Sequence, residues 1–140
     1  MSFSSFLTLT DEETKLLLQS VNDLIGKLNL LVDNFYQHFL GSSKEISDLF
    51  KNVDMPKQHN MFIVSIGAII SNIDNPSLIQ ANLDELIDKH ILYGIQPFHV
   101  PFFSDAYTNT ITEIYGVEDP IMKVWLKIIH STMEYFKSKL

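Results

Sequence analysis

The sequence of 140 residues contains no cysteine and no arginine. Without cysteine the chain has neither disulfide bonds nor thiolate chemistry, which suits a reducing cytoplasm. All ten basic residues are lysines, the net charge is −7, and the lysines form no basic run. Because nucleic-acid binding depends on clustered positive charge, these features argue against a nucleic-acid partner.

Long hydrophobic runs are lacking as well. The apolar stretch at residues 61–70 is too short for a membrane-spanning helix, which needs about 20 residues. The first ten residues, MSFSSFLTLT, lack the charged start and the extended apolar segment of a signal peptide. We therefore expect a cytoplasmic protein with no membrane partner. A composition of 46% hydrophobic and 19% charged residues predicts one globular domain over residues 1–140.

The hydrophobic residues recur with helical spacing, and no stretch alternates with period two for long enough to predict a strand. Capping and breaking residues divide this pattern into segments. Helix starts are predicted at Thr10, Asp54, Asn75, Pro101 and Asp119, and stops at Gly41, Gly94 and Gly116. Gly26 would bend or break the first long run. The sequence thus predicts an all-α domain of about six or seven helices.

Three polar residues fall on helix faces that otherwise consist of core residues: Tyr36, Gln58 and His90. Each has an ordinary structural explanation, such as a hydroxyl at the rim of the core or a histidine bonded to a carbonyl. A buried polar group without a partner costs about 1–3 kcal/mol, so three that converge on one space suggest an occupant. A flat apolar ligand with a central metal would use all three, because neutral imidazole is a common iron ligand.

Four motifs then occur in order along the chain. They are FYQHF (35–39), SDLF ending at Phe50, DMPKQHNMF (54–62) and DKHILYGIQPFHVP (88–101). Their order and spacing, with the helix of Trp125 behind them, resemble the globins over residues 15–136. The resemblance is to the bacterial flavohaemoglobin-type and single-domain haemoglobins.

This resemblance implies a globin fold of six to eight helices packed around a pocket for haem b, iron protoporphyrin IX. His90 would be the fifth ligand to iron, with its other ring nitrogen toward the carbonyl of Leu86. Tyr36 and Gln58 would lie on the opposite, distal side and donate hydrogen bonds to O2, NO or CO. The residues expected to contact the cofactor are Phe50, Phe62, Leu86, His90 and Ile95, and further apolar walls are expected from Val32, Phe35 and Ile66.

Two other histidines have alternative interpretations. His59 follows Gln58 and should point about 100° away from it on a helix. In a different helix register His59 would instead reach the iron. His99 stands where the family often has histidine; it could reach a haem propionate, but we expect it at the surface.

The sequence also departs from the flavohaemoglobin pattern. Val100 replaces a tyrosine of the family, and the chain ends before a glutamate expected on the last helix, so peroxidase-like chemistry is not favoured. The 140 residues leave no room for a flavin or NAD(P)H module. We therefore expect a haem globin that binds O2 reversibly and supports NO dioxygenation only with a separate reductase. The alternatives are a gas or redox sensor that acts through a partner protein, and a haem-free globin-fold interaction module.

Overall fold

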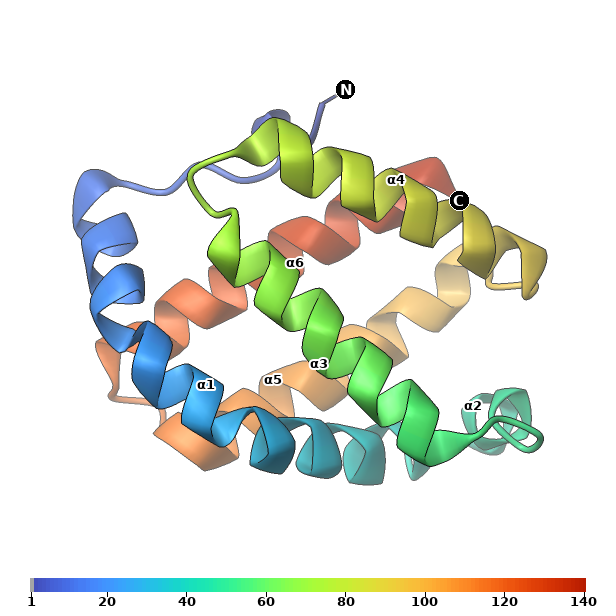
Figure 1. Cartoon of the computed structure of the whole chain (residues 1–140). Coiled ribbons are helices and arrows are strands. Elements are labelled where there is room, and N and C mark those ends of the chain that lie inside the picture. The colour runs from blue at the N-terminus through green and yellow to red at the C-terminus, as the bar shows by residue number, and fades with distance from the viewer. Residues whose placement is uncertain (1) are drawn as a thin grey trace.

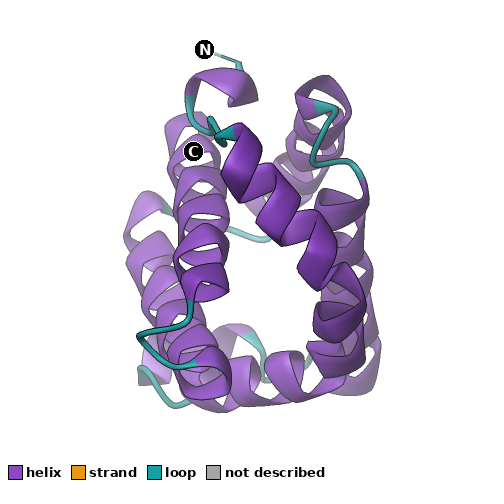
Figure 2. Cartoon of the chain, turned by 90° about the vertical axis from the view of Figure 1, so that its left-hand side faces the viewer, coloured by secondary structure: helices purple, strands orange, loops and turns teal. Residues whose placement is uncertain are grey.

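A computed structural model describes residues 2–140 and confirms the predicted all-α class. Six α-helices and two short 3-10 helices make up the regular structure of the described residues, without any strand (Figures 1 and 2). Their bounds are η1 Phe3–Ser5, α1 Asp11–Leu40, α2 Lys44–Leu49, α3 Met55–Ser71, α4 Pro76–Leu92, η2 Pro97–His99, α5 Val100–Tyr115 and α6 Pro120–Lys139. None of these helices combines the length and the apolar character that crossing a bilayer would require.

The helix boundaries follow the capping residues of the sequence. Thr10 Oγ1 accepts a hydrogen bond from the Glu13 amide at 3.1 Å, and Glu13 Oε1 accepts one from the Thr10 amide at 2.9 Å. This reciprocal capping box satisfies amides that have no partner within the helix. The side chains of Asp54, Asn75 and Asp119 also accept hydrogen bonds from backbone amides, at the starts of α3, α4 and α6.

The first long helix does not break at Gly26. α1 runs unbroken from Asp11 to Leu40, although Figure 1 shows that it changes direction partway along its length. A glycine inside a helix costs only about 1 kcal/mol relative to alanine. Leu24 and Leu28, on either side of Gly26, are both buried in the core, and this burial outweighs that cost.

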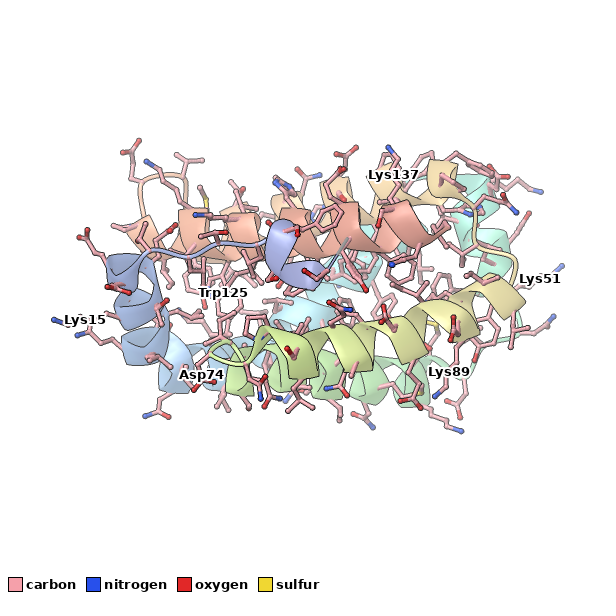
Figure 3. The ribbon with its side chains drawn as sticks, turned by 90° about the horizontal axis from the view of Figure 1, so that it is seen from above. Lys15, Lys51, Asp74, Lys89, Trp125 and Lys137 are labelled. Atoms are coloured by element: carbon pink, nitrogen blue, oxygen red, sulfur yellow. The ribbon has the colours of Figure 1, made fainter. Side chains whose placement is uncertain are left out.

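The main hydrophobic core lies between α1, α5 and α6, with α3 packed against α1. Its largest fully buried side chains include Trp125, Tyr107 and Phe35. Figure 3 shows Trp125 in the interior, while the labelled lysines extend from the periphery. The core therefore rests on contacts among helices far apart in the sequence, as in other helical folds without bundle connectivity.

A second, smaller core holds α4 against the end of α6 and the N-terminal turn. Its buried members are Phe3, Ile79, Leu83, Ile87, Tyr135 and Phe136. The N-terminal turn and the end of α6 both lie beside α4 in Figure 1. Across residues 2–140, no α4 residue belongs to the main core. The helix that carries His90 is therefore supported by a different core from the helix that carries Tyr36, while Ile69 of α3 packs against both cores.

Candidate functional site

Tyr36 and Gln58 meet across the interface between α1 and α3. Gln58 Nε2 donates a hydrogen bond to Tyr36 Oη at 3.1 Å, and Tyr36 is 7% exposed. Burial raises the pKa of Tyr36, against the opposing effect of the bond from Gln58, so the phenol stays protonated at neutral pH. Because its oxygen accepts the bond from Gln58, the hydroxyl proton remains available to donate to a third group.

Aromatic side chains surround this polar pair. The ring of Phe62 packs edge-on against those of Phe35 and Tyr36, with centroids 4.9 and 5.9 Å apart. Phe50 also packs edge-on against Tyr36, with centroids 5.9 Å apart. Phe103, from α5, lies 4.7 Å from Phe35. The phenol is thus buried in an apolar wall that strengthens its hydrogen bonding, while Gln58 beside it is partly exposed.

His90 occupies the last turn of α4. Its Nδ1 lies 2.8 Å from the carbonyl oxygen of Leu86, as predicted from helix geometry. An Nδ1–H donated to that carbonyl leaves the lone pair on Nε2 free to bind a metal. Burial lowers the pKa of His90, and the bond to Leu86 opposes this effect only in part, so the neutral form is favoured.

The chain turns sharply directly after His90. Gly94 has a φ of +86°, the Gly94 amide donates to the Ile91 carbonyl, and the Ile95 amide donates to the His90 carbonyl. This pair of bonds is a Schellman motif, which needs a residue in the left-handed region and therefore favours glycine. The motif confirms the predicted helix stop at Gly94 and brings Ile95 back toward the turn that carries His90.

The two sets of predicted site residues remain separate from each other in the protein. Phe50, Phe62 and Gln58 gather around Tyr36, whereas Leu86, His90 and Ile95 belong to α4 and the turn after it. Among residues 2–140, no hydrogen bond or ring contact joins His90 to the Tyr36 group. Any group that contacts both Tyr36 and His90 must therefore bridge these two sets of residues.

A shallow surface hollow of about 610 Å³ lies between α3 and α4. Its lining residues are Asp54, Pro56, Lys57, Asn60, Met61, Val64, Ser65, Leu86 and Lys89. Leu86 was predicted to contact the cofactor and lies in this lining, whereas Tyr36, Gln58 and His90 do not. This hollow combines apolar side chains with the ammonium groups of Lys57 and Lys89 and the carboxylate of Asp54.

His90 and the residues around Tyr36 fit a haem group. In the described chain, no three histidine, aspartate or glutamate side chains gather to hold a metal ion by themselves. A single imidazole suits porphyrin iron, because the porphyrin supplies the equatorial ligands. The neutral imidazole of His90 could bind the iron, and the aromatic side chains around Tyr36 could cover the porphyrin.

The structure also accounts for His59 and His99, the two histidines with alternative interpretations. His59 Nδ1 lies 3.3 Å from Asp33 Oδ1 on α1, which agrees with the register that turns His59 away from Gln58. The expectation that His99 lies at the surface is wrong, since it is only 7% exposed. His99 Nδ1 accepts a hydrogen bond from the Gln96 amide at 2.9 Å, and the ring packs on Phe98. The tight turn that follows Gly94 folds His99 inward.

Sequence reasoning missed two neighbours of the His90 imidazole. Phe136, near the end of α6, packs edge-on against it with ring centroids 5.3 Å apart. Tyr93 also packs edge-on against it, with ring centroids 5.8 Å apart. The spacing of three residues could have indicated Tyr93, because residues i and i+3 are neighbours on a helix. No local pattern could have indicated Phe136, which is 46 residues away.

Comparison with known proteins identifies the fold family. The family model described as Globin matches residues 33–136, which contain Tyr36, Gln58 and His90. The chain belongs to the globin family. Membership of this family implies that the protein binds haem, in agreement with the neutral imidazole of His90.

The curated relatives of this globin include flavohemoproteins. The flavohemoprotein of Xylella fastidiosa is 25% identical over 114 residues, which cover 78% of this chain and 28% of the relative. The flavohemoprotein of Rhizobium meliloti is 23% identical over 99 residues, which cover 68% of this chain and 25% of the relative. The chain therefore spans about a quarter of the length of these proteins.

A solved structure agrees with the fold of this globin. An engineered carbene transferase, described as a putative nitric oxide dioxygenase from Rhodothermus marinus, superposes with a TM-score of 0.79. The match covers 94% of this chain and 93% of the other, at 21% sequence identity. At this identity the likeness concerns the fold alone.

Proposed function

We propose that this globin binds haem b through His90 and binds O2, NO and CO reversibly on the side of Tyr36 and Gln58. The observation that carries this proposal is the hydrogen bond of 3.1 Å between Gln58 and Tyr36. This bond leaves the phenol proton of Tyr36 free to donate, and it places the two polar groups in a wall that is otherwise aromatic. A small ligand with partial negative charge would be stabilised there by two preorganised donors.

The type of haem is part of this proposal. Attachment of c-type haem requires cysteine, and this chain contains none. Its haem would therefore be held without covalent links to the porphyrin, by His90 and by the apolar side chains around Tyr36. The cofactor contributes reversible binding of diatomic gases, and the protein contributes orientation, dryness and hydrogen bonding.

The proposal extends to conversion of NO. Joining O2 and NO into nitrate consumes one electron, which a separate reductase would supply. Two neighbours in the comparisons support this extension: the relatives are named flavohemoproteins, and the solved structure is described as a putative nitric oxide dioxygenase. In single-turnover experiments NO should be consumed once by the O2-loaded protein, and repeatedly only when a reductase is added.

The primary test is a titration of the purified protein with haem, followed by visible absorption spectroscopy. We expect a Soret band that shifts when CO is added to the reduced protein. The His90→Leu variant should lose the absorption spectrum of an imidazole-bound haem, and it should release haem faster than the wild type. An exposed histidine on α6 provides a matched control, so His130→Leu should leave both properties unchanged.

Two results would contradict the proposal. The first is a wild-type protein that acquires no Soret band when haem is added, which would favour a haem-free interaction module. The second is a His90→Leu variant with the spectrum and haem affinity of the wild type. In that case another residue binds the iron, and His59 is the next histidine to replace because it follows Gln58 on α3.

A further inference from the structure

The second core supports α4 along two adjacent stripes of its surface. Ile79, Leu83 and Ile87 recur every four residues along α4 and are buried against α6 and the N-terminal turn. The neighbouring stripe is polar. The Phe3 amide donates a hydrogen bond to Gln80 Oε1 at 2.8 Å, and the Tyr135 hydroxyl donates one to Asp84 Oδ1.

These two stripes together prevent rotation of α4 about its axis. Successive helical residues point about 100° apart, so Ile79 and Gln80 begin stripes that face different directions. A helix held by a single apolar stripe can roll on its support, because apolar contact is not directional. The two hydrogen bonds, one helical turn apart, add direction to that contact.

The N-terminal segment, residues 2–7, contacts both stripes of α4. Phe3 is 1% exposed, and its ring packs edge-on against Tyr135 with centroids 5.6 Å apart. The ring of Phe6 also packs edge-on against Tyr135, with centroids 5.6 Å apart, and Leu7 packs against the second core. The segment therefore contacts Tyr135 directly and α4 through Gln80, and it ties α4 to α6.

The second core also reaches the imidazole of His90. Phe136, a buried member of this core, packs edge-on against the His90 ring at 5.3 Å. His90 follows Ile87 by three residues and continues the same side of the helix. A small rotation or shift of α4 would therefore change both the direction of Nε2 and the contact with Phe136.

We propose that Phe3 and the Tyr135–Asp84 pair are positioning residues for His90. The N-terminal segment and the end of α6 fix the rotation of α4, and thereby the direction in which Nε2 approaches the iron. This inference rests on the proposed function in that His90 is taken as the iron ligand. The support of α4 by the N-terminal segment can be tested without haem.

The first experiment measures amide hydrogen exchange in the haem-free protein. Phe3→Ala should raise exchange of residues 79–90 by about tenfold relative to α5, equivalent to about 1.4 kcal/mol of local stability. Phe3→Leu, which keeps most of the apolar volume, should restore protection. Ile111→Ala removes a fully buried side chain from the main core and serves as the matched control. It should raise exchange in α5 at least as much as in α4.

The second experiment follows His90 itself. In the haem-free protein, the ring-current shift that Phe136 imposes on the His90 ring protons should decrease in Phe3→Ala. In the ferrous haem-loaded protein, the iron–histidine stretching band should shift or broaden in Phe3→Ala and remain unchanged in Ile111→Ala. Tyr135→Phe removes only the hydroxyl and should act in the same direction. Asp84→Asn keeps an acceptor oxygen and should resemble the wild type more closely.

The outcomes separate this inference from the proposed function. If Phe3→Ala raises exchange equally in α4 and α5, the N-terminal segment does not specifically hold α4, and the inference is wrong. It is also wrong if exchange rises only in α4 while the ring-current shift and the iron–histidine band stay constant. A wild-type protein that takes up no haem would contradict the proposed function, and hydrogen exchange and the ring-current shift would still decide whether the segment positions His90.

Discussion

Tyr36 and His90 are held in place by different parts of the molecule. Tyr36 lies in the second half of a long helix that packs against α3, α5 and α6, and its ring belongs to the main core. His90 lies at the end of α4, which rests on the small second core and on the N-terminal turn. The distal donors thus share the stability of the whole fold, whereas the imidazole depends on a local set of contacts.

This difference suggests how the two sides of the site behave. Regions with few buried contacts open locally at a lower free energy than the global unfolding transition. The distal wall should open only when the main core unfolds, so its hydrogen-bond geometry should stay constant. The proximal helix should move more readily, and haem uptake and release should involve α4 rather than α1 or α3.

The largest expected effect on stability comes from a change in the aromatic wall around Tyr36. Phe35 is fully buried and its ring contacts those of Tyr36, Phe62 and Phe103. Phe35→Ala should therefore lower the free energy of unfolding of the haem-free protein by about 3–5 kcal/mol, measured by urea denaturation. Phe98→Ala, at a half-exposed position after α4, should change it by less than about 0.5 kcal/mol. Similar effects of the two variants would show that the main core does not dominate stability.

Part of this arrangement could be predicted from the sequence, because it depends on local signals. Thr10, Asp54, Asn75 and Asp119 cap helices where the sequence places them, and Gly94 ends α4. The proximity of Tyr36 and Gln58 was also predicted, although that inference needed the resemblance to globins as well as helical spacing.

The remaining features depend on contacts between distant segments. The continuity of α1 through Gly26, the burial of His99 and the packing of Phe136 on His90 all arise from tertiary structure, which local propensity does not encode. The second core likewise joins the two ends of the chain to α4. The roles of His90, Tyr36 and Gln58 toward haem and gases remain predictions for the experiments described here.

Replacement of Tyr36 or Gln58 should give the second-largest effect. A net hydrogen bond to a bound ligand contributes about 1–2 kcal/mol, so loss of one donor should speed O2 release about tenfold. Tyr36→Phe and Gln58→Leu should each show this increase in stopped-flow measurements of O2 dissociation. Gln37→Leu, next to Tyr36 in sequence but exposed, should dissociate O2 at the wild-type rate. Slow release that persists in the double variant would show that the distal assignment is wrong.

The turn after α4 allows the support of His90 to be tested through a change in backbone conformation alone. A Cβ added at Gly94 would meet no atom within 4 Å, so the cost of Gly94→Ala arises from its φ of +86°. We expect a loss of about 1–2 kcal/mol, seen as faster exchange near His90. Gly26→Ala, in helical backbone with equally open space, should instead stabilise the protein by about 0.5–1 kcal/mol. Equal effects of both variants would contradict the strain assigned to Gly94.

The effect that is smallest at neutral pH concerns the Tyr135–Asp84 pair, because it appears only at alkaline pH. Burial, with the hydrogen bond to Asp84, raises the pKa of Tyr135 to about 12, from an ordinary value near 10. Because the unfolded chain loses this proton first, the stability that the pair contributes is complete below pH 10 and is lost as the pH rises toward 12. Denaturation of the haem-free protein between pH 9 and 12 should show a steeper decline for the wild type than for Tyr135→Phe. Phe35→Ala keeps Tyr135 and should decline as steeply as the wild type from its lower starting stability. Parallel curves for the wild type and Tyr135→Phe would mean that this hydroxyl does not link α6 to α4, leaving Phe3 and the apolar stripe to hold the proximal helix.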